Sequence, residues 1–352
     1  MIDWTKSMQQ TFEYFTVDPY TWKDKEKLSC VISSSITRDS TVNTLGSATI
    51  DVVDVVGEEY IRIYLKVIQN GYQERIPLGT YLAQTPNSKF NGKTRHVTID
   101  AYTPLLELNE TMPPLGYSIP KQTNIMDMVY KLTTENMRAP VVNTSSTTKL
   151  YYDFIANTDD TWLTFIKDLM VNDKYKFDLD ELGRVLFQPE QDVLSLQPTW
   201  TYTDDNSSIL YPDIDTEHDI YGIPNVVEVI YSNDQDMLYS KVENTDSNSP
   251  LSIPNRGRRI VYRDTNPSII GNATQPEIDK YAENLLRELS SVEFKITYTH
   301  GYCPVRIGDC VRLNYKKAGL SDIKAKVISQ TIKCTPGAPV TETAVFTTKL
   351  WR

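Results

Sequence analysis

Three histidines are the first residues to consider for chemistry, because imidazole takes up and releases a proton near neutral pH. They are His96, His218 and His300, and none stands in an HExxH or similar metal-binding spacing. His96 falls on a predicted exposed strand face, which favours a surface role. His218 has Glu217 and Asp219 beside it, which would favour the charged imidazolium or help bind a metal, although a solvated loop accounts for the same run.

The four cysteines raise the question of a metal or a disulfide. His300 with Cys303, Cys310 and Cys334 has the composition of a Cys3His zinc site, but structural zinc sites normally use ligand pairs two to four residues apart. Cys30 is the fourth, and no CxxC spacing occurs. A chain of this length does not need disulfides to fold. We therefore expect half-buried, reduced cysteines in strand cores, no metal ligand and no metal.

Adjacent carboxylates are the remaining candidates for acid–base chemistry, because glycoside hydrolysis needs two carboxyl groups that flank the substrate. The pairs are Asp159-Asp160, Glu58-Glu59 and Asp204-Asp205. Asp159 is also explained as the N-cap of a helix, and Glu58-Glu59 adjoins a predicted turn at Gly57. No pair therefore identifies an active site.

Phosphate-binding signatures do not occur, since the chain has neither a Walker A loop nor a GxGxxG sequence. A short basic cluster, Arg256-Gly-Arg-Arg259, lies in a predicted loop, where we expect it to contact a carboxylate. The sequence thus predicts no catalytic residue, no cofactor-binding residue and no cofactor, and it favours a protein that is not an enzyme.

Composition limits the protein class further. The 352 residues are 40% hydrophobic and carry a formal charge of -10, which argues against a general nucleic-acid binder. No run of 18 apolar residues and no standard signal peptide occur, so we expect neither membrane insertion nor standard secretion. The negative charge is local, because residues 201–250 contain one Lys against eleven Asp and Glu.

The elements that would position these residues begin with strands. Ile61, Ile63, Leu65 and Val67 alternate with Arg62, Tyr64 and Lys66, a period of two that predicts a buried face for the first set and a solvated face for the second. Asn70-Gly71 and Asn91-Gly92 each favour a hairpin turn, and Pro77 marks an edge or a bulge. Together with strands predicted at 29–37 and 47–56, this makes a meander of five or six strands, enough for a small β-barrel.

The middle of the chain changes character after Pro113-Pro114. Asn124 is a predicted N-cap for a helix with apolar residues at i, i+3, i+4 and i+7, and a second such helix follows Thr158 to Asp160. A hairpin is predicted over 175–180 and 184–188. Residues 113–200 therefore form a predicted α+β unit inside a β-rich chain.

The last part returns to strands. We expect one at 225–231, a polar loop or linker over 232–258, and a helix that begins at the capping box from Thr274 to Glu277. Strands follow at 294–299, 309–315, 323–333 and 341–350. The predicted fold class is mainly β with an α+β insertion: two small β-barrel domains plus an inserted α+β domain.

Several segments resemble one known family. They are LSCVISSSITRD, EEYIRIYLKVIQNGYQERIPLGTYLAQTP, AYTPLLELNETMPPLGYSIPKQTNIMDMVYKL and GYCPVRIGDCVRLNY. Together they resemble the baseplate hub proteins of contractile phage tails, in particular those of PBSX-like prophages and of phage-tail-like bacteriocins. Such hubs are similar to the N-terminal part of type VI secretion spike proteins.

The resemblance implies a ring-forming homotrimer of pseudo-sixfold symmetry that joins a sixfold tail tube to a threefold central spike. Carried onto this chain, it implies a first barrel from residues 1–112 with 201–245, an insertion at 113–200, and a second barrel with one helix at 250–352. Implied partners are the tail tube protein, the central spike protein and also tape-measure and baseplate wedge proteins. The implied location is the baseplate of a virion or tail-like particle, assembled in the bacterial cytoplasm, with no sequence-specific nucleic-acid binding.

Two alternatives stay open. One is a tail-associated cell-wall hydrolase using acidic residues such as Asp159 and Glu217, and the other is a host-receptor-binding module. The acidic segment has two explanations of its own. Either its loops face the lumen of the ring and repel the phosphates of passing DNA, or they contact basic residues of a neighbour such as Arg256, Arg258 and Arg259.

Overall fold

The chain folds into two compact units. The computed structural model describes residues 2–53, 57–90, 92–93, 95–192, 195–218, 220–232, 237–265, 267 and 273–349. The first unit comprises Met1–Ile214 with Thr297–Ala344, and the second comprises Asp215–Ile296 with Val345–Arg352. Strands dominate both, so the chain is mainly β, as predicted.

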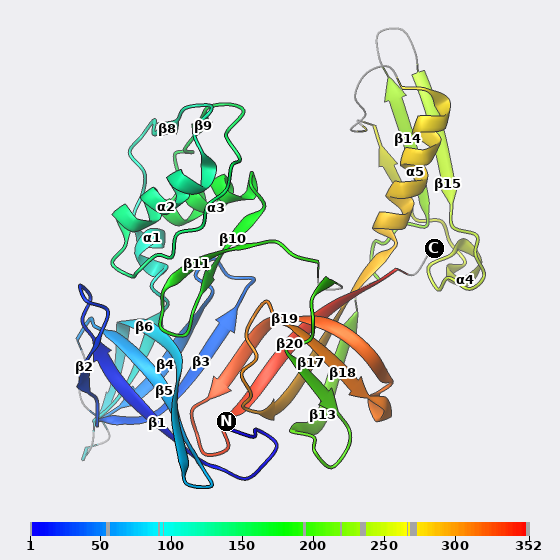
Figure 1. Cartoon of the computed structure of the whole chain (residues 1–352). Coiled ribbons are helices and arrows are strands. Elements are labelled where there is room, and N and C mark those ends of the chain that lie inside the picture. The colour runs from blue at the N-terminus through cyan, green and yellow to red at the C-terminus, as the bar shows by residue number, and fades with distance from the viewer. Residues whose placement is uncertain are drawn as a thin grey trace. The chain divides into compact units, whose positions relative to one another are not determined.

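Seven strands make the N-terminal part of the first unit (Figure 1). Their order in the sheet is β3-β4-β7-β6-β5-β1-β2. Tyr14 in β1 and Ser34 in β3 share a hydrogen bond of 3.0 Å, so strands near the two ends of this row meet over one apolar core. The strands are β1 (Gln9–Val17), β2 (Asp24–Lys27), β3 (Val31–Asp39), β4 (Gly46–Val52), β5 (Tyr60–Gln69), β6 (Tyr72–Phe90) and β7 (Arg95–Tyr102).

The turns between these strands follow from residue type. Asn70 and Gly71 have φ of 51° and 81°, which confirms the predicted hairpin between β5 and β6. Pro77 lies beside the bulge in that ladder, as predicted. β6 and β7 also pair as an antiparallel hairpin, although Asn91 lies outside the described residues.

Burial corrects one feature of β5. Arg62 and Tyr64 were expected on a solvated face, yet they are 3% and 6% exposed. The reason is a second covering layer, because the β10–β11 turn and β2 contact these side chains.

The α+β insertion is a separate layer of the first unit (Figure 1). Both predicted helices are confirmed, and they pack their apolar stripes into a single core. The predicted hairpin is confirmed as β10 paired with β11. The elements are α1 (Leu106–Glu110), β8 (Ser118–Ile119), α2 (Ile125–Asn136), β9 (Phe154–Ile155), α3 (Trp162–Val171), β10 (Tyr175–Leu179) and β11 (Val185–Pro189).

Of the two predicted N-caps in the insertion, one is right and one is wrong. Asn124 caps α2, since its side chain accepts a hydrogen bond from the backbone N–H of Asp127. The cap of α3 is Thr161 and not Asp159. Thr161 and Thr164 bond to each other's backbone N–H, and this reciprocal arrangement starts the helix two residues later than expected.

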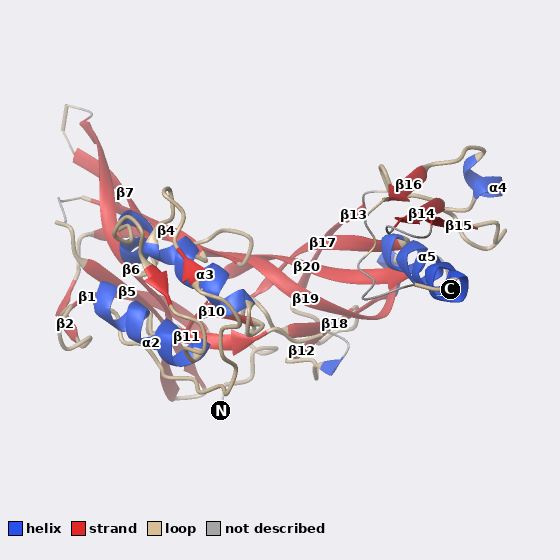
Figure 2. Ribbon diagram, turned by 90° about the horizontal axis from the view of Figure 1, so that it is seen from above, coloured by secondary structure: helices blue, strands red, loops and turns tan. Residues whose placement is uncertain are grey.

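The C-terminal strands form a second barrel-like sheet, in which β17, β20 and β19 run side by side (Figure 2). β19 also pairs with β3, so one continuous sheet joins the two barrel-like halves. All four predicted C-terminal strands are confirmed. The elements are β12 (Trp200–Thr203), β13 (Leu210–His218), β17 (Ser291–Gly301), β18 (Cys310–Tyr315), the 3-10 helix η2 (Lys316–Ala318), β19 (Leu320–Lys333) and β20 (Pro339–Lys349).

The acidic residues 201–219 are largely strand, whereas loops were expected there. β12 pairs with β18 in parallel, and β13 lies beside β17. In β13 the carboxylates Asp213, Asp215 and Glu217 alternate along one face and are all exposed, so charge hid the strand from a hydrophobicity pattern. Pro212 fits this position because proline is tolerated in an edge strand.

The second unit has its own small core. The helix α5 (Gln275–Leu289) packs on a three-stranded sheet of order β15-β14-β16, through a cluster that includes Val227, Val229, Ile278, Ala282 and Leu286. The capping box from Thr274 to Glu277 is confirmed. The other elements are β14 (Val226–Ser232), β15 (Met237–Glu243), α4 (Ile253–Arg256) and β16 (Val261–Asp264).

The predicted loop over 232–258 is therefore wrong, because it contains β15 and α4. The predicted division into two barrel domains and an insertion, with its boundaries, stays a prediction. The strand ladders place β12 and β13 beside the C-terminal strands β18 and β17.

Candidate functional site

The three histidines lie in different surroundings. His96 is exposed on β7, as predicted. His218 stands at the end of β13, not in a loop, and its side chain lies outside the described part of the chain. His300, in β17, is fully buried.

His300 belongs to a polar cluster that we call the buried cluster, made of Tyr202, Tyr298, His300, Gln330 and Glu342. Each of the five is at most 2% exposed. Tyr298 donates to Glu342 Oε1, and Gln330 Nε2 donates to Glu342 Oε2 at 2.7 Å. His300 Nε2 lies 3.4 Å from Glu342 Oε2 and 3.1 Å from the Tyr202 hydroxyl. The cluster joins β12, β17, β19 and β20 from inside.

The geometry indicates a buried ion pair. His300 Nδ1 lies 2.7 Å from the Gly301 carbonyl, which only accepts, so Nδ1 carries a proton while Nε2 faces the carboxylate. Burial alone would lower the pKa of His300, but its partners Cys303 and Glu342 raise the pKa to about 10. We assign the rise chiefly to Glu342, because an ordinary thiol is neutral near pH 7. No substrate reaches side chains this deeply covered, so the cluster has a structural role.

Cys30 is half-buried, whereas Cys303, Cys310 and Cys334 are buried more deeply than expected. Of the four, Cys310 alone lies within a strand, so the predicted placement in strand cores is wrong for the other three. Cys303 lies near His300, with its sulfur 3.8 Å from Nδ1, whereas Cys334 packs in the N-terminal core. Within the described ranges, no group of three or more His, Cys, Asp or Glu side chains is placed to hold a metal ion. The Cys3His alternative has no counterpart in that part of the chain.

Each acid pair contains one residue that accepts a hydrogen bond from a group elsewhere in the chain. Glu58 accepts a hydrogen bond from Gln84 at 3.1 Å, and Asp205 accepts one from the Ser207 backbone at 2.8 Å. Asp159 and Glu217, the two residues of the hydrolase alternative, are both exposed and belong to different compact units.

The basic cluster at 256–259 makes two kinds of contact. Arg259 lies 3.4 Å from a carboxylate oxygen of Glu243, as expected. Arg256 instead donates to the carbonyls of Ile223 and Ile220, at 2.7 and 2.9 Å. These arginines therefore already have partners within their own chain.

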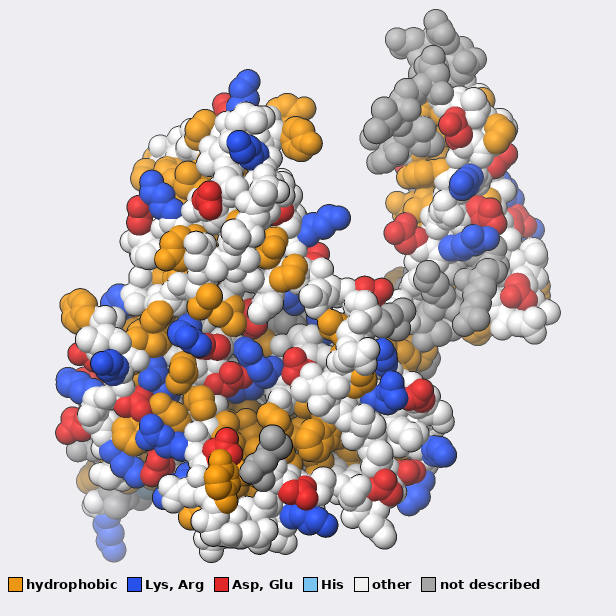
Figure 3. Space-filling view, viewed as in Figure 1, with side chains coloured by type: hydrophobic (Ala, Val, Ile, Leu, Met, Phe, Trp, Pro, Cys, Tyr) orange, Lys and Arg blue, Asp and Glu red, His pale blue; other side chains and the backbone are white. Residues whose placement is uncertain are grey.

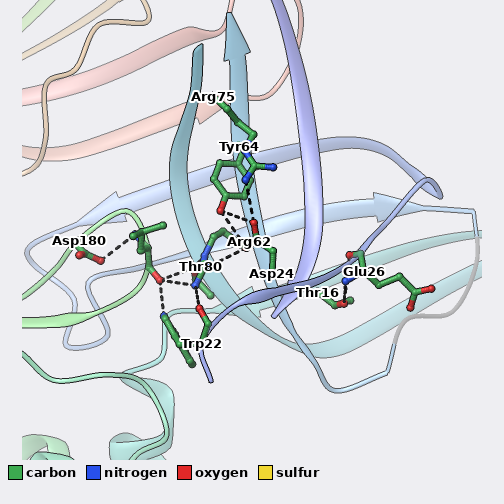
Figure 4. Close-up of polar contacts among 10 residues, drawn as sticks. Thr16, Trp22, Asp24, Glu26, Arg62, Tyr64, Arg75, Thr80 and Asp180 are labelled. Atoms are coloured by element: carbon green, nitrogen blue, oxygen red, sulfur yellow. Dashed lines mark hydrogen bonds and ion pairs between the residues drawn. The ribbon is translucent and has the colours of Figure 1, made fainter. Parts of the chain in front are cut away.

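An anchor that the sequence did not predict holds the insertion to the N-terminal sheet (Figure 4). Three donors converge on the Leu182 carbonyl in the β10–β11 turn: Trp22 Nε1 at 2.7 Å, Thr80 Oγ1 at 2.9 Å and an Arg62 nitrogen at 3.1 Å. Gly183 next to it has a φ of 75°, and a Cβ there would lie 2.7 Å from the Thr80 Cβ. The turn thus needs glycine both for its backbone and for its close approach.

Asp24 neutralises the buried guanidinium of this anchor. Its carboxylate lies 2.8 Å from Arg62, accepts from the Tyr64 hydroxyl at 2.8 Å and lies 3.3 Å from Arg75 (Figure 4). A buried charge must be paired, so these contacts are a condition for the Arg62 position. An arginine inside the otherwise apolar run YIRIYL was the one signal in the sequence that could have pointed to it.

A second anchor joins the insertion to the C-terminal sheet. Arg306 donates to the Leu179 carbonyl and lies 2.6 Å from Glu181, while Lys324 donates to the Leu196 carbonyl at 3.0 Å. The insertion is therefore tied to both barrel-like halves.

Beside this second anchor lies a hollow that we call the lysine cleft. Its volume is about 480 Å³, and α3, the β10–β11 hairpin, the segments 188–191 and 196–199 and the loop 306–310 line it. Lys167, Lys176 and Lys326 line it too.

Comparison with solved structures defines the class of fold. A tail protein from Neisseria meningitidis MC58 matches 96% of this chain and 97% of its own, with 12% identity and a TM-score of 0.60. The 43 kDa tail protein of prophage MuSo2 from Shewanella oneidensis matches 95% and 98%, with 10% identity and a TM-score of 0.62. An Escherichia coli component of the type VI secretion system matches 92% and 76%, with 11% identity and a TM-score of 0.51.

The chain therefore has the fold shared by phage tail proteins and type VI secretion spike-related proteins, as the sequence resemblance implied. No protein-family model matches the sequence, and no curated protein matches it. In the described residues, no helix combines the length and the apolar character needed to cross a membrane.

Proposed function

We propose that this protein is a structural baseplate hub of a contractile tail or tail-like particle. It acts as a homotrimer of pseudo-sixfold symmetry that joins the sixfold tail tube to the threefold central spike. The observation that carries the proposal is the match of its fold to phage tail proteins over 95–96% of the chain. Its place is the baseplate at the tail tip.

The internal architecture supports this role. Each chain has two barrel-like sheets that are continuous through the β19–β3 ladder. Three chains would thus supply six barrels to one ring, which is how a threefold assembly can match a sixfold one. The proposed domains are the N-terminal barrel, the insertion and the C-terminal barrel with its helix. β12 and β13 belong with the C-terminal barrel in this proposal, because they pair with its strands.

The insertion offers a surface for further partners. Five large apolar side chains on its loops and on β9 are at least 61% exposed, and Figure 3 shows apolar side chains gathered at its tip. Exposed apolar patches of this kind mark protein–protein contacts. Besides the tail tube and spike, we propose a baseplate wedge or tape-measure protein as the partner here. The residues are Met112, Leu115, Tyr151, Tyr152 and Ile155.

The proposed role is not enzymatic. The buried cluster that contains His300 is closed to solvent, and the acidic residues of the hydrolase alternative are exposed in separate units. Loss of cell-wall lysis in an Asp159→Asn or Glu217→Gln variant of a lytic preparation would contradict this part of the proposal.

Light scattering on the purified full-length protein tests the assembly. We expect a mass of about 121 kDa, three times the 40.3 kDa chain, at micromolar concentration. A mass of about 40 kDa that stays unchanged when the spike protein is added would contradict the hub assignment.

A further inference from the structure

Lys176 and Lys326 both line the lysine cleft. Lys176 lies on β10 and Lys326 on β19, and both side chains are half-buried. Among the described residues, neither ammonium group forms an ion pair with a carboxylate. Burial and the nearby charge of Lys176 lower the pKa of Lys326. Two cations held together without an anion raise the free energy of the folded chain.

The other charged groups of the cleft do not neutralise Lys176 and Lys326. Asp178 lies 3.7 Å from the guanidinium of Arg306. Asp309 accepts a hydrogen bond of 3.0 Å from the backbone N–H of Arg306. Glu190 is exposed and interacts with Lys326 over a longer range. A third lysine, Lys167, donates to the Asn43 side chain at 2.8 Å. The cleft lining thus carries four cationic side chains, those of Arg306 and the three lysines, against three carboxylates, those of Asp178, Glu190 and Asp309.

The opposite charge occurs on β13. Asp213, Asp215 and Glu217 lie on one exposed face of this strand, at the end of the strand order of its sheet. Alternate residues of a strand lie about 6.5 to 7 Å apart, a spacing that two flexible lysines in one cleft can match. No Lys or Arg occurs between Arg184 and Lys241, so the strand has no cation nearby in sequence.

A cyclic trimer gives a reason to connect the two surfaces. A closed ring of three identical chains needs a head-to-tail interface, in which two different patches of the same chain meet. We propose that the carboxylates of β13 of one copy bind the lysine cleft of a second copy, as an intersubunit contact of the trimer. This inference rests on the proposed trimer and identifies charged residues that hold it together.

Charge reversal with restoration tests the contact. The variants are Lys176→Glu with Lys326→Glu, Asp213→Lys with Asp215→Lys, and the four changes combined. We expect each double reversal to raise the dissociation constant of the trimer at least tenfold, measured by light scattering over a concentration series. The combined variant should return to within about threefold of the unchanged protein, because opposite charges face each other again.

Two controls make the outcome interpretable. Lys316→Glu with Lys317→Glu changes two exposed lysines outside the cleft by the same charge and should leave the trimer unchanged. Lys176→Gln with Lys326→Gln removes the charges with little change of shape, and it should weaken the trimer less than the reversal. Unchanged thermal unfolding will show that each variant folds.

Three results would overturn the inference. If both double reversals change the dissociation constant of the trimer no more than the control does, this contact is excluded and the hub proposal still stands. Weakening without recovery in the combined variant shows that these two patches do not meet each other. A monomeric unchanged protein, also with the spike present, ends both the inference and the proposed function.

Discussion

Glu342 is the residue on which the second barrel depends most directly. Its carboxylate accepts from Tyr298 and Gln330 and faces His300, all inside the sheet. Replacing it by Gln leaves the imidazolium without its counter-charge in a site that is 0% exposed. Removing one partner of such a pair costs about 3 kcal/mol, so we expect Glu342→Gln to lower the free energy of unfolding by about this amount. Chemical denaturation at pH 6.5 measures it.

The same pair predicts a pH dependence. The pKa of His300 rises from 6.5 to about 10 on folding, so the folded chain holds this proton more tightly than the unfolded chain does. The stabilisation is complete below pH 6.5 and is lost as the pH rises towards 10. The free energy of unfolding should fall over this range in the unchanged protein and fall less in Glu342→Gln. Equal pH slopes in the two proteins would contradict the ion pair.

Among the elements, the β10–β11 turn has the most specific requirement. Gly183→Ala places a methyl group 2.7 Å from Thr80 at a positive φ, whereas Gly116→Ala has a similar φ of 77° with open space around it. The backbone strain alone costs about 1 to 2 kcal/mol, and the steric conflict adds about 1 to 3 kcal/mol. We expect Gly183→Ala to lower the free energy of unfolding by about 1 to 3 kcal/mol more than Gly116→Ala does, because only Gly183→Ala adds the steric conflict.

Hydrogen exchange distinguishes the cause of the difference. If the Leu182 carbonyl holds the insertion to the N-terminal sheet, Gly183→Ala should raise exchange in the β10–β11 hairpin and near Trp22, while Gly116→Ala should not. Similar stability losses in both variants would mean that the turn does not dock as described.

Elements with a one-sided apolar pattern were predictable from the sequence. α2, α3 and α5 show their spacing plainly because each packs one stripe on a core. β13 and β15 were missed because many of their side chains are exposed and are acidic or of mixed type. Too few apolar side chains remain in either strand to produce an alternating pattern. The cap of α3 was misplaced because Asp159, Asp160 and Thr161 are all good caps, and only the Thr161–Thr164 pairing decides among them.

At the scale of the whole molecule, contacts between distant residues set the limit of prediction. Arg62 meets the Leu182 carbonyl over 120 positions of sequence, and His300 meets Glu342 over 42. The sequence gives one weak sign of each contact, namely a charged residue, arginine or glutamate, within an otherwise apolar strand. The order of strand, insertion and strand was nevertheless visible, because composition and periodicity change where the layers change.

The two compact units lead to a prediction about how the chain unfolds. The core clusters of the N-terminal sheet and of the insertion contain no residue of the second unit, and the α5 cluster contains none of the first. We therefore expect two thermal transitions. Leu286→Ala, in α5, should lower the temperature of one transition, and Leu163→Ala, in α3, should lower that of the other. Each substitution should reduce the unfolding free energy of its own unit by about 2 to 5 kcal/mol, because both leucines are 0% exposed.

Scanning calorimetry on the full chain measures both variants against the unchanged protein. Three strands, β13, β17 and β20, contribute residues to both units, so they are the route by which the units could unfold together. A single transition that both substitutions shift equally would show that backbone ladders, and not side-chain cores, determine the cooperative unit. Separate shifts would mean that the second unit can open while the barrels of the proposed ring stay folded.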